Sequence, residues 1–268
     1  MTTLLAGYAF FLGAIIGSFL NVVIHRYPLG ESIVFPPSRC PKCGERIRAF
    51  DNVPILSFLV LGGRCRRCRA PISIRYPLVE LANGLFFLAI YLRTGLSVWF
   101  LPLAAVVSMT LVLIYIDAEI QILPDVIDIP GIGFGLLIGG ASLGLQYPDL
   151  VLSTSLTDSL IGAAAGASLL LTIGLLYKLI RKIEGMGLGD VKMLAMLGAC
   201  CGWRSLFAIL LIASVSGALI GVGIMIATRR SNLQFALPFG VFLGLAFLIT
   251  IFFGRALGDW LPALALGS

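Results

Sequence analysis

Charged residues are scarce in this chain of 268 residues. Only 12% of its residues are charged and its mean hydropathy is +1.04, whereas soluble globular proteins carry about 25% charged residues. The hydrophobic residues, 59% of the total, fall in runs of about 18 to 24 with almost no charge inside, the length that crosses a bilayer as a helix. The sequence leaves no room for a soluble enzyme domain and predicts an all-α polytopic membrane protein.

The apolar runs predict about eight membrane-spanning helices and one polar insert near the N-terminus. The first run lacks a preceding basic residue and a following small-residue cleavage site, so it is predicted to be a retained span and not a signal peptide. The expected spans are 4–23, 78–92, 98–116, 126–145, 160–176, a short one at 191–201, 206–226 and 235–253.

The distribution of the 19 Lys and Arg residues predicts the orientation, because short cytoplasmic loops retain positive charge. With the N-terminus outside, sixteen fall on the cytoplasmic side, ten of them in residues 26–75, and three fall opposite: Arg93, Arg204 and Arg255. The net charge of +6 is then a property of the cytoplasmic face. A nucleic-acid partner is not expected, because the basic residues lie next to the spans and no aromatic ladder is interleaved with them.

The insert carries two CxxC pairs, Cys40 with Cys43 and Cys65 with Cys68, separated by 21 residues. Two such turns facing each other supply the tetrahedral four-sulfur shell that zinc prefers, and they leave no open position for a catalytic water. A pair of disulfides is the alternative, which the expected cytoplasmic placement disfavours. The insert is therefore predicted to be a small cytoplasmic loop domain with structural Zn²⁺. Cys200 and Cys201 lie in an apolar run and are expected to be packing residues.

Carboxylates at membrane depth are costly and mark function. Asp117 follows an apolar run at the cytoplasmic end of the third span, and Asp190 stands at the entrance of the short sixth span, after glycines that include Gly187 and Gly189. Two carboxylates that share one proton form an aspartic-protease pair, one acting as base toward water and the other as acid toward a peptide carbonyl. The glycines are predicted to let a substrate backbone approach closely.

Other features have simpler interpretations. Glu119 and Asp125 remain undecided between catalytic and surface roles. A phosphate-binding loop before Asp190 is disfavoured, because no strand precedes it and no Lys-Ser or Lys-Thr pair follows. Glycine pairs such as Gly13 and Gly17 are expected on helix-packing faces. Four acids are predicted to be helix caps or solvated residues: Asp128, Asp149, Asp158 and Asp259.

These motifs, in this order, resemble the bifunctional type IV prepilin peptidases of bacteria, members of the GxGD aspartyl protease class. The resemblance covers nearly the whole chain. It is carried by 17–26 (GSFLNVVIHR), both CxxC pairs, 52–57 (NVPILS), 75–80 (RYPLVE), Asp117 with Pro124 and Asp125, 185–192 (GMGLGDVK) and 238–240 (PFG).

The resemblance implies an inner-membrane enzyme that cuts the basic leader from type IV prepilins or type II secretion pseudopilins at the cytoplasmic membrane edge. The enzyme then methylates the new N-terminal residue, usually Phe, with S-adenosylmethionine. Its catalytic pair maps onto Asp117 and Asp190. Since no dinucleotide-type glycine fingerprint is present, the methyl-donor residues are not assigned; the junction of loop and spans is expected to hold the donor, with Glu80 as a candidate.

The implied division of the chain is a first span in 1–26, a zinc-knuckle loop associated with methylation in 27–76, a second span in 77–96, a peptidase domain in 97–256 and a C-terminal tail in 257–268. A hypothesis based on charge alone assigns recognition of the basic leader to acidic residues: Glu31, Glu45, Asp51, Glu119, Asp125 and Asp128. Two alternatives stay open, a non-catalytic zinc-bearing assembly scaffold and a transporter, although the acids lie at one membrane edge and no half-to-half repeat is visible.

Overall fold

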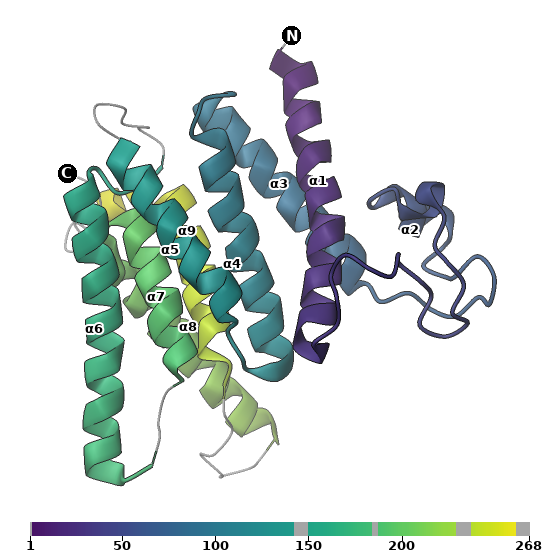
Figure 1. Cartoon of the computed structure of the whole chain (residues 1–268). Coiled ribbons are helices and arrows are strands. Elements are labelled where there is room, and N and C mark those ends of the chain that lie inside the picture. Colours follow the sequence, from purple (N-terminus) through teal and green to yellow (C-terminus); the bar gives the residue numbers. More distant parts are fainter. Residues whose placement is uncertain (1, 142–149, 184–186, 229–236, 261–268) are drawn as a thin grey trace. The chain divides into compact units, whose positions relative to one another are not determined.

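The computed structural model describes residues 2–141, 150–183, 187–228 and 237–260, and its regular structure is helical (Figure 1). Within these residues no β-strand occurs, and extended pairing is limited to two isolated bridges in the loop that follows α1. The elements in chain order are α1 (Thr2–Arg26), η1 (Tyr27–Leu29), η2 (Ala49–Asn52), α2 (Leu56–Val60), α3 (Arg75–Thr94), α4 (Phe100–Ile120), α5 (Asp125–Ala141), α6 (Leu156–Arg181), α7 (Leu188–Cys201), α8 (Trp203–Thr228) and α9 (Phe239–Trp260).

A helix lies at each of the eight predicted spans, and five helices are long and apolar enough to cross a membrane. The prediction of an all-α protein with membrane-spanning helices is therefore confirmed at this level. The five are Thr3–Leu29, Phe100–Ile120, Leu156–Arg181, Trp203–Ala227 and Phe239–Ala256. Residues 142–145 and 235–236 of two predicted spans, and 261–268 of the predicted tail, lie outside the described residues.

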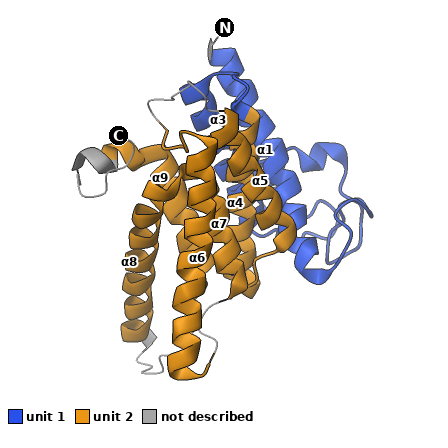
Figure 2. Ribbon diagram, turned by 60° about the vertical axis from the view of Figure 1, so that its left-hand side comes forward, with its two compact units in different colours: residues 1–100 blue, residues 101–268 orange. Residues whose placement is uncertain are grey.

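The chain divides into two compact units, Met1–Phe100 and Leu101–Ser268 (Figure 2). In the first unit α1 packs against α3 through small residues. A Cβ at Gly17 would lie 2.8 Å from the Cα of Glu80, so the two backbones approach as closely as glycine allows. The amide Nδ2 of Asn83 donates to the Gly13 carbonyl at 2.7 Å, and that of Asn21 donates to the Tyr76 carbonyl at 3.0 Å. Gly13 and Gly17 thus lie on a helix-packing face, as expected.

In the second unit α7 is the central helix, packed against α5, α6, α8 and α9. Every residue from Met193 to Cys201 is buried. The neighbours approach through glycine: a Cβ at Gly166 would lie 2.6 Å from the Leu194 carbonyl oxygen, and Gly162 lies directly against Gly198. Cys200 and Cys201 belong to this buried run, in agreement with a packing role. The glycines let the neighbouring backbones come close, while Met193, Leu194 and Met196 fill the space around α7.

Two of the four acids predicted to be caps or solvated residues have described side chains, and they differ. Asp158 lies in the first turn of α6, after the N-cap Ser155, and helps to cap the helix start: its Oδ2 accepts a hydrogen bond from the Thr154 N–H at 3.2 Å. The prediction for Asp128 is wrong, because its side chain is fully buried in the first turns of α5. The charge pattern around it suggests an exposed helix start, whereas tertiary packing covers this face. Asp149 and the side chain of Asp259 lie outside the described residues.

Candidate active site

Asp117 accepts a hydrogen bond from the backbone of a helix that is distant in sequence. It lies in the last turn of α4, is 4% exposed, and its Oδ2 accepts a hydrogen bond from the Val241 N–H of α9 at 3.0 Å. A Cβ at Gly240 would lie 2.9 Å from the same oxygen. The start of α9 can therefore support this carboxylate only because residue 240 has no side chain.

Asp190 lies in the first turn of α7, with Gly187 as the N-cap. Its half-buried carboxylate accepts a hydrogen bond from the Gly187 backbone and is close enough to Asp117 to interact with it electrostatically. The two predicted catalytic acids therefore come together from α4 and α7, which are about seventy residues apart in sequence.

Leu123, a residue that sequence analysis did not single out, lies between the elements that carry the acids. A Cβ at Gly189 would be 2.7 Å from the Leu123 Cβ, and a Cβ at Gly240 would be 3.1 Å from its Cδ1. Gly189 thus packs inside the first turn of α7, while Gly187 is exposed just before it. The sequence around Leu123 does not reveal this contact, because an apolar residue before a proline is common.

The other acids near the pair divide by exposure. Asp125 is exposed and forms an ion pair with Lys192, its Oδ1 lying 2.6 Å from Nζ, and Glu119 is exposed at the end of α4. Asp128 is buried and interacts electrostatically with Asp190. These contacts narrow the hypothesis of leader recognition by charge, because Asp125 is paired and Asp128 is covered.

The four cysteines of the CxxC pairs converge in the loop between α1 and α3. Their sulfur atoms all lie within 4.8 Å of one another, with Cys40 and Cys68 at 3.8 Å, and all four are free thiols. Sulfurs around one zinc ion are about 3.8 Å apart. The cluster therefore has the composition and spacing of a four-sulfur metal site, and the alternative of two disulfides is not what the structure contains.

The two CxxC turns have the same local construction. The Gly44 N–H donates to the Cys40 carbonyl and the Arg69 N–H donates to the Cys65 carbonyl, each closing a turn of five residues. Gly44 and Arg69 both have positive φ, which ends each turn sharply. Backbone N–H groups of Cys68 and Arg67 point at the Cys65 sulfur and lower the pKa of that thiol to about 7. A thiolate is the form that binds metal.

Ion pairs connect the second CxxC turn to the rest of the loop. Arg66 grips both carboxylate oxygens of Asp51 at 2.6 to 3.0 Å and lowers the pKa of that carboxyl, and Arg67 pairs with Glu45 beside the first turn. Glu45 and Asp51 therefore each have an arginine partner within the loop.

Glu80 lies on α3, buried against the loop. Its Oε2 accepts a hydrogen bond from the Ile55 N–H at 2.7 Å, and the Ser18 hydroxyl bonds to the same carboxylate. Ile55 has a φ of 62°, which a β-branched residue adopts only when its surroundings hold it there. Glu80 therefore anchors the return of the loop to the membrane-spanning part of this unit.

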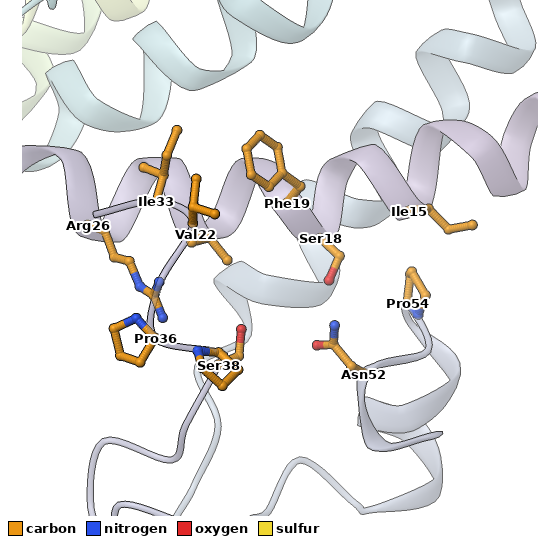
Figure 3. Close-up of a pocket in the computed structure, with 12 residues that line it drawn as sticks. Ile15, Ser18, Phe19, Val22, Arg26, Ile33, Pro36, Ser38, Asn52 and Pro54 are labelled. Carbon is orange, nitrogen blue, oxygen red and sulfur yellow. The ribbon is translucent and has the colours of Figure 1, made fainter. Parts of the chain in front are cut away.

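A pocket of about 290 Å³ opens beside Ser18, between α1 and the loop (Figure 3). Apolar side chains of α1 form one wall and prolines of the loop form the other, with a few polar groups between them. The polar lining consists of Ser18, Arg26, Ser38 and Asn52. Such a mixture is typical of small-molecule sites.

Comparison with known proteins agrees with this layout. Residues 11–94 match the bacterial peptidase A24 N-terminal domain and residues 104–222 match the type IV leader peptidase family. A prepilin leader peptidase/N-methyltransferase of Pseudomonas putida is 39% identical over 265 residues, covering 91% of this chain and 88% of that protein. The proteins of that name from Burkholderia pseudomallei strain 1026b and Aeromonas hydrophila are 39% and 38% identical, covering 92% and 94% of this chain and 85% and 91% of their own lengths.

No solved structure gives a significant match to the chain. The family assignment therefore rests on sequence, and it agrees with the resemblance inferred from the motifs. With both family models matched in order and relatives aligned over almost its whole length, the chain belongs to the type IV leader peptidase family.

Proposed function

We propose that this protein is a membrane aspartic endopeptidase that removes the leader peptide of type IV prepilins or type II secretion pseudopilins. It then N-methylates the new N-terminal residue with S-adenosylmethionine. The observation that carries the peptidase assignment is the buried Asp117 carboxylate, fixed by the Val241 N–H and close to Asp190 inside the segment matched by the leader peptidase family. Relatives named prepilin leader peptidase/N-methyltransferase support both activities.

The cleavage chemistry follows from two acids with different surroundings. Asp117 is the more buried and is oriented by a backbone N–H, whereas Asp190 is half-buried at a helix start. With one proton between them, the ionised carboxylate accepts a proton from water, and the protonated one donates to the scissile carbonyl oxygen. Water adds to the carbonyl carbon, and collapse of the tetrahedral intermediate with proton transfer to the amide nitrogen releases the leader.

The substrate backbone is proposed to approach past Gly187, the exposed residue before α7. Gly189 supports that approach from within the helix, where its missing side chain lets Leu123 fill the space under the pair. The two glycines of the predicted approach loop would then act differently, Gly187 at the substrate and Gly189 in packing.

The pocket beside Ser18 is the proposed site of the methyl donor. S-adenosylmethionine supplies an electrophilic methyl group on a sulfonium, and it also carries a carboxylate and an adenine ring. Arg26 offers charged donors for the carboxylate, and Asn52 offers both amide groups for hydrogen bonding. Glu80 is hydrogen-bonded to the hydroxyl of Ser18, which lines the pocket, and so fixes that hydroxyl in place. The residues present therefore fit the donor's functional groups.

Zinc is the metal proposed to bind to the cysteine cluster. In residues 27–74, all of which the structure describes, Cys40 is the only buried residue. A loop without an apolar core requires another source of folding free energy, and a four-sulfur zinc site supplies it. The ion would hold the loop that forms one wall of the donor pocket. This places its proposed role in methylation more than in cleavage.

We further propose eight membrane spans in the inner membrane, with the N-terminus outside and the active site facing the cytoplasm. The charge distribution supports this orientation, since sixteen of the 19 Lys and Arg residues then lie inside. Cysteine mapping with a membrane-impermeant reagent tests it. Labelling of a cysteine introduced at Leu96 from outside and at Ile183 only after permeabilisation is the expected pattern.

Mass spectrometry of a prepilin incubated with the purified protein tests the proposed function. Cleaved product without S-adenosylmethionine, and a mass increase of one methyl group with it, are expected. No cleavage by the intact protein would refute the proposal. Cleavage by Asp117→Asn at the wild-type rate would show that another site does the chemistry.

A further inference from the structure

Asp128 is a third acid beside the proposed catalytic pair, and the cleavage chemistry described above does not use it. Its side chain is fully buried, and neither of its carboxylate oxygens accepts a hydrogen bond within the described part of the chain. An ionised carboxylate in such surroundings is costly unless a cation or a proton balances it. The position therefore requires a physical reason.

The register of α5 against α7 places Asp128 at the level of the catalytic turn. The two helices run in the same direction, because Gly131 contacts Met196 and, one turn later, a Cβ at Gly135 would lie 2.7 Å from the Cβ of Ala199. Asp128 precedes Gly131 by one turn. Its counterpart on α7 is the turn before Met196, the turn that contains Lys192.

Charged groups surround Asp128 where α5 packs against α7. It interacts electrostatically with Asp125, Lys192 and Asp190. Lys192 reaches both oxygens of Asp125, at 2.6 and 2.7 Å, and so lies between an exposed and a buried carboxylate. Asp190 stands two residues before Lys192.

The other helices packed around α5 and α7 add few charges. α6, which packs on both α5 and α7, has no titratable residue between Asp158 and Tyr177. α4 contributes Asp117 and, at its exposed end, Glu119. Asp128 is thus a buried acid that interacts electrostatically with Asp190 and with the ion pair of Asp125 and Lys192.

We propose that Asp128 is a positioning residue for leader cleavage, whose negative charge beside Asp190, balanced by Lys192, sets the upper pH limit at which the catalytic pair keeps its shared proton. The proposal rests on the proposed peptidase function. Its physical basis is that a nearby negative charge makes a second carboxyl hold its proton to higher pH. At low pH Asp128 is neutral and has no such effect.

The test is the pH profile of kcat/KM for a prepilin peptide, measured for the wild type, Asp128→Asn and Asp128→Leu. Both variants should lose activity at lower pH than the wild type, with the alkaline midpoint moved down by about one unit, so that the rate above the midpoint falls about tenfold. The acid limb should stay in place. Asp158→Asn removes an acid in the first turn of α6, beside Gly202 at the opposite end of α7 from Asp190, and should move neither limb.

Replacement by Leu of a buried carboxyl that accepts no hydrogen bond is expected to preserve or raise the melting temperature. An unchanged alkaline limb in folded Asp128→Leu protein would overturn the proposal. Failure of both variants to fold would also overturn it, since that would reveal a structural partner for the carboxyl. Absence of cleavage by the wild type would instead refute the peptidase function itself.

Discussion

Two regions of the protein hold their candidate site residues in place by different means: the loop between α1 and α3, and the central helix α7. In residues 27–74 a single residue, Cys40, is buried, and large apolar side chains such as Val60 are as much as 81% exposed. In α7 every residue from Met193 to Cys201 is buried. The loop is therefore organised by turns, ion pairs and thiols, and the peptidase site by close helix packing.

This difference predicts how each region responds to change. A side chain held by packed backbones has no alternative position, so a small steric change should be severe. A loop held by many exposed contacts should lose its organisation in steps, except where the cysteine cluster itself is removed. Substitutions in the two regions test this contrast.

The largest effect is expected from Asp117→Asn and Asp190→Asn. Each removes one half of the proposed proton-sharing pair, so cleavage should fall by at least about 10³-fold while the fold is retained. Initial rates of leader removal from a prepilin peptide provide the measurement. Asp125→Asn is the matched control: its carboxylate is exposed, and loss of its surface pair with Lys192 should leave the rate within about threefold of wild type. Substantial turnover by either pair variant would refute the dyad.

A smaller but still severe loss is expected from Gly240→Ala. The added Cβ would lie 2.9 Å from Asp117 Oδ2 and 3.1 Å from the Leu123 Cδ1, so the start of α9 or the carboxylate must shift. A shift of the proposed catalytic carboxylate should lower the rate, by up to about 10²-fold if the shift reaches about 1 Å.

Gly223→Ala in α8 is the control for Gly240→Ala, because no atom lies within 4 Å of its added Cβ. Helix propensity alone favours this change by about 1 kcal/mol. Thermal stability and cleavage rate should therefore both be preserved. Wild-type cleavage by Gly240→Ala would mean that the site tolerates movement and that the contrast with the loop is overstated.

An intermediate and selective effect is expected from the double variant Cys40→Ser/Cys43→Ser. Removal of two ligands should abolish zinc binding, measured by elemental analysis, and should suppress methylation before it suppresses cleavage. Cys200→Ala, which removes a thiol outside the cluster, should keep its zinc. Product masses separate cleaved from cleaved and methylated chains. Equal loss of both activities in membrane-inserted protein would show that the loop also shapes the protease site.

Sequence patterns predict the helices, the candidate acid pair and the cysteine cluster, because hydrophobic runs, acids at their ends and CxxC spacing are local signals. Asp117, Asp190 and the four cysteines are each identifiable without knowledge of packing. Leu123, Gly240 and buried Asp128 are not, since their importance depends on which helix faces them. Asp128 in particular resembles an exposed helix-start acid until α7 covers it. The number of spans and the residues of the methyl-donor site remain predictions.

The smallest effect is expected from Asp51→Asn, which removes the carboxylate gripped by Arg66 but leaves the four thiols in place. Zinc retention against a chelator should weaken by no more than a few-fold, and less at high salt, because the pair is at the surface.

The pH dependence of this effect follows from the ion pair. Arg66 lowers the pKa of Asp51 below its ordinary value. The contribution of the pair is therefore complete above the unfolded value of about 3.9 and is lost only as the pH falls through the lower folded value. The difference between variant and wild type should thus be constant between about pH 5 and 8. Glu31→Gln makes the same charge change elsewhere in the loop and should not alter zinc retention. A loss as large as that caused by removing cysteines would show that the loop, like the helices, depends on single contacts.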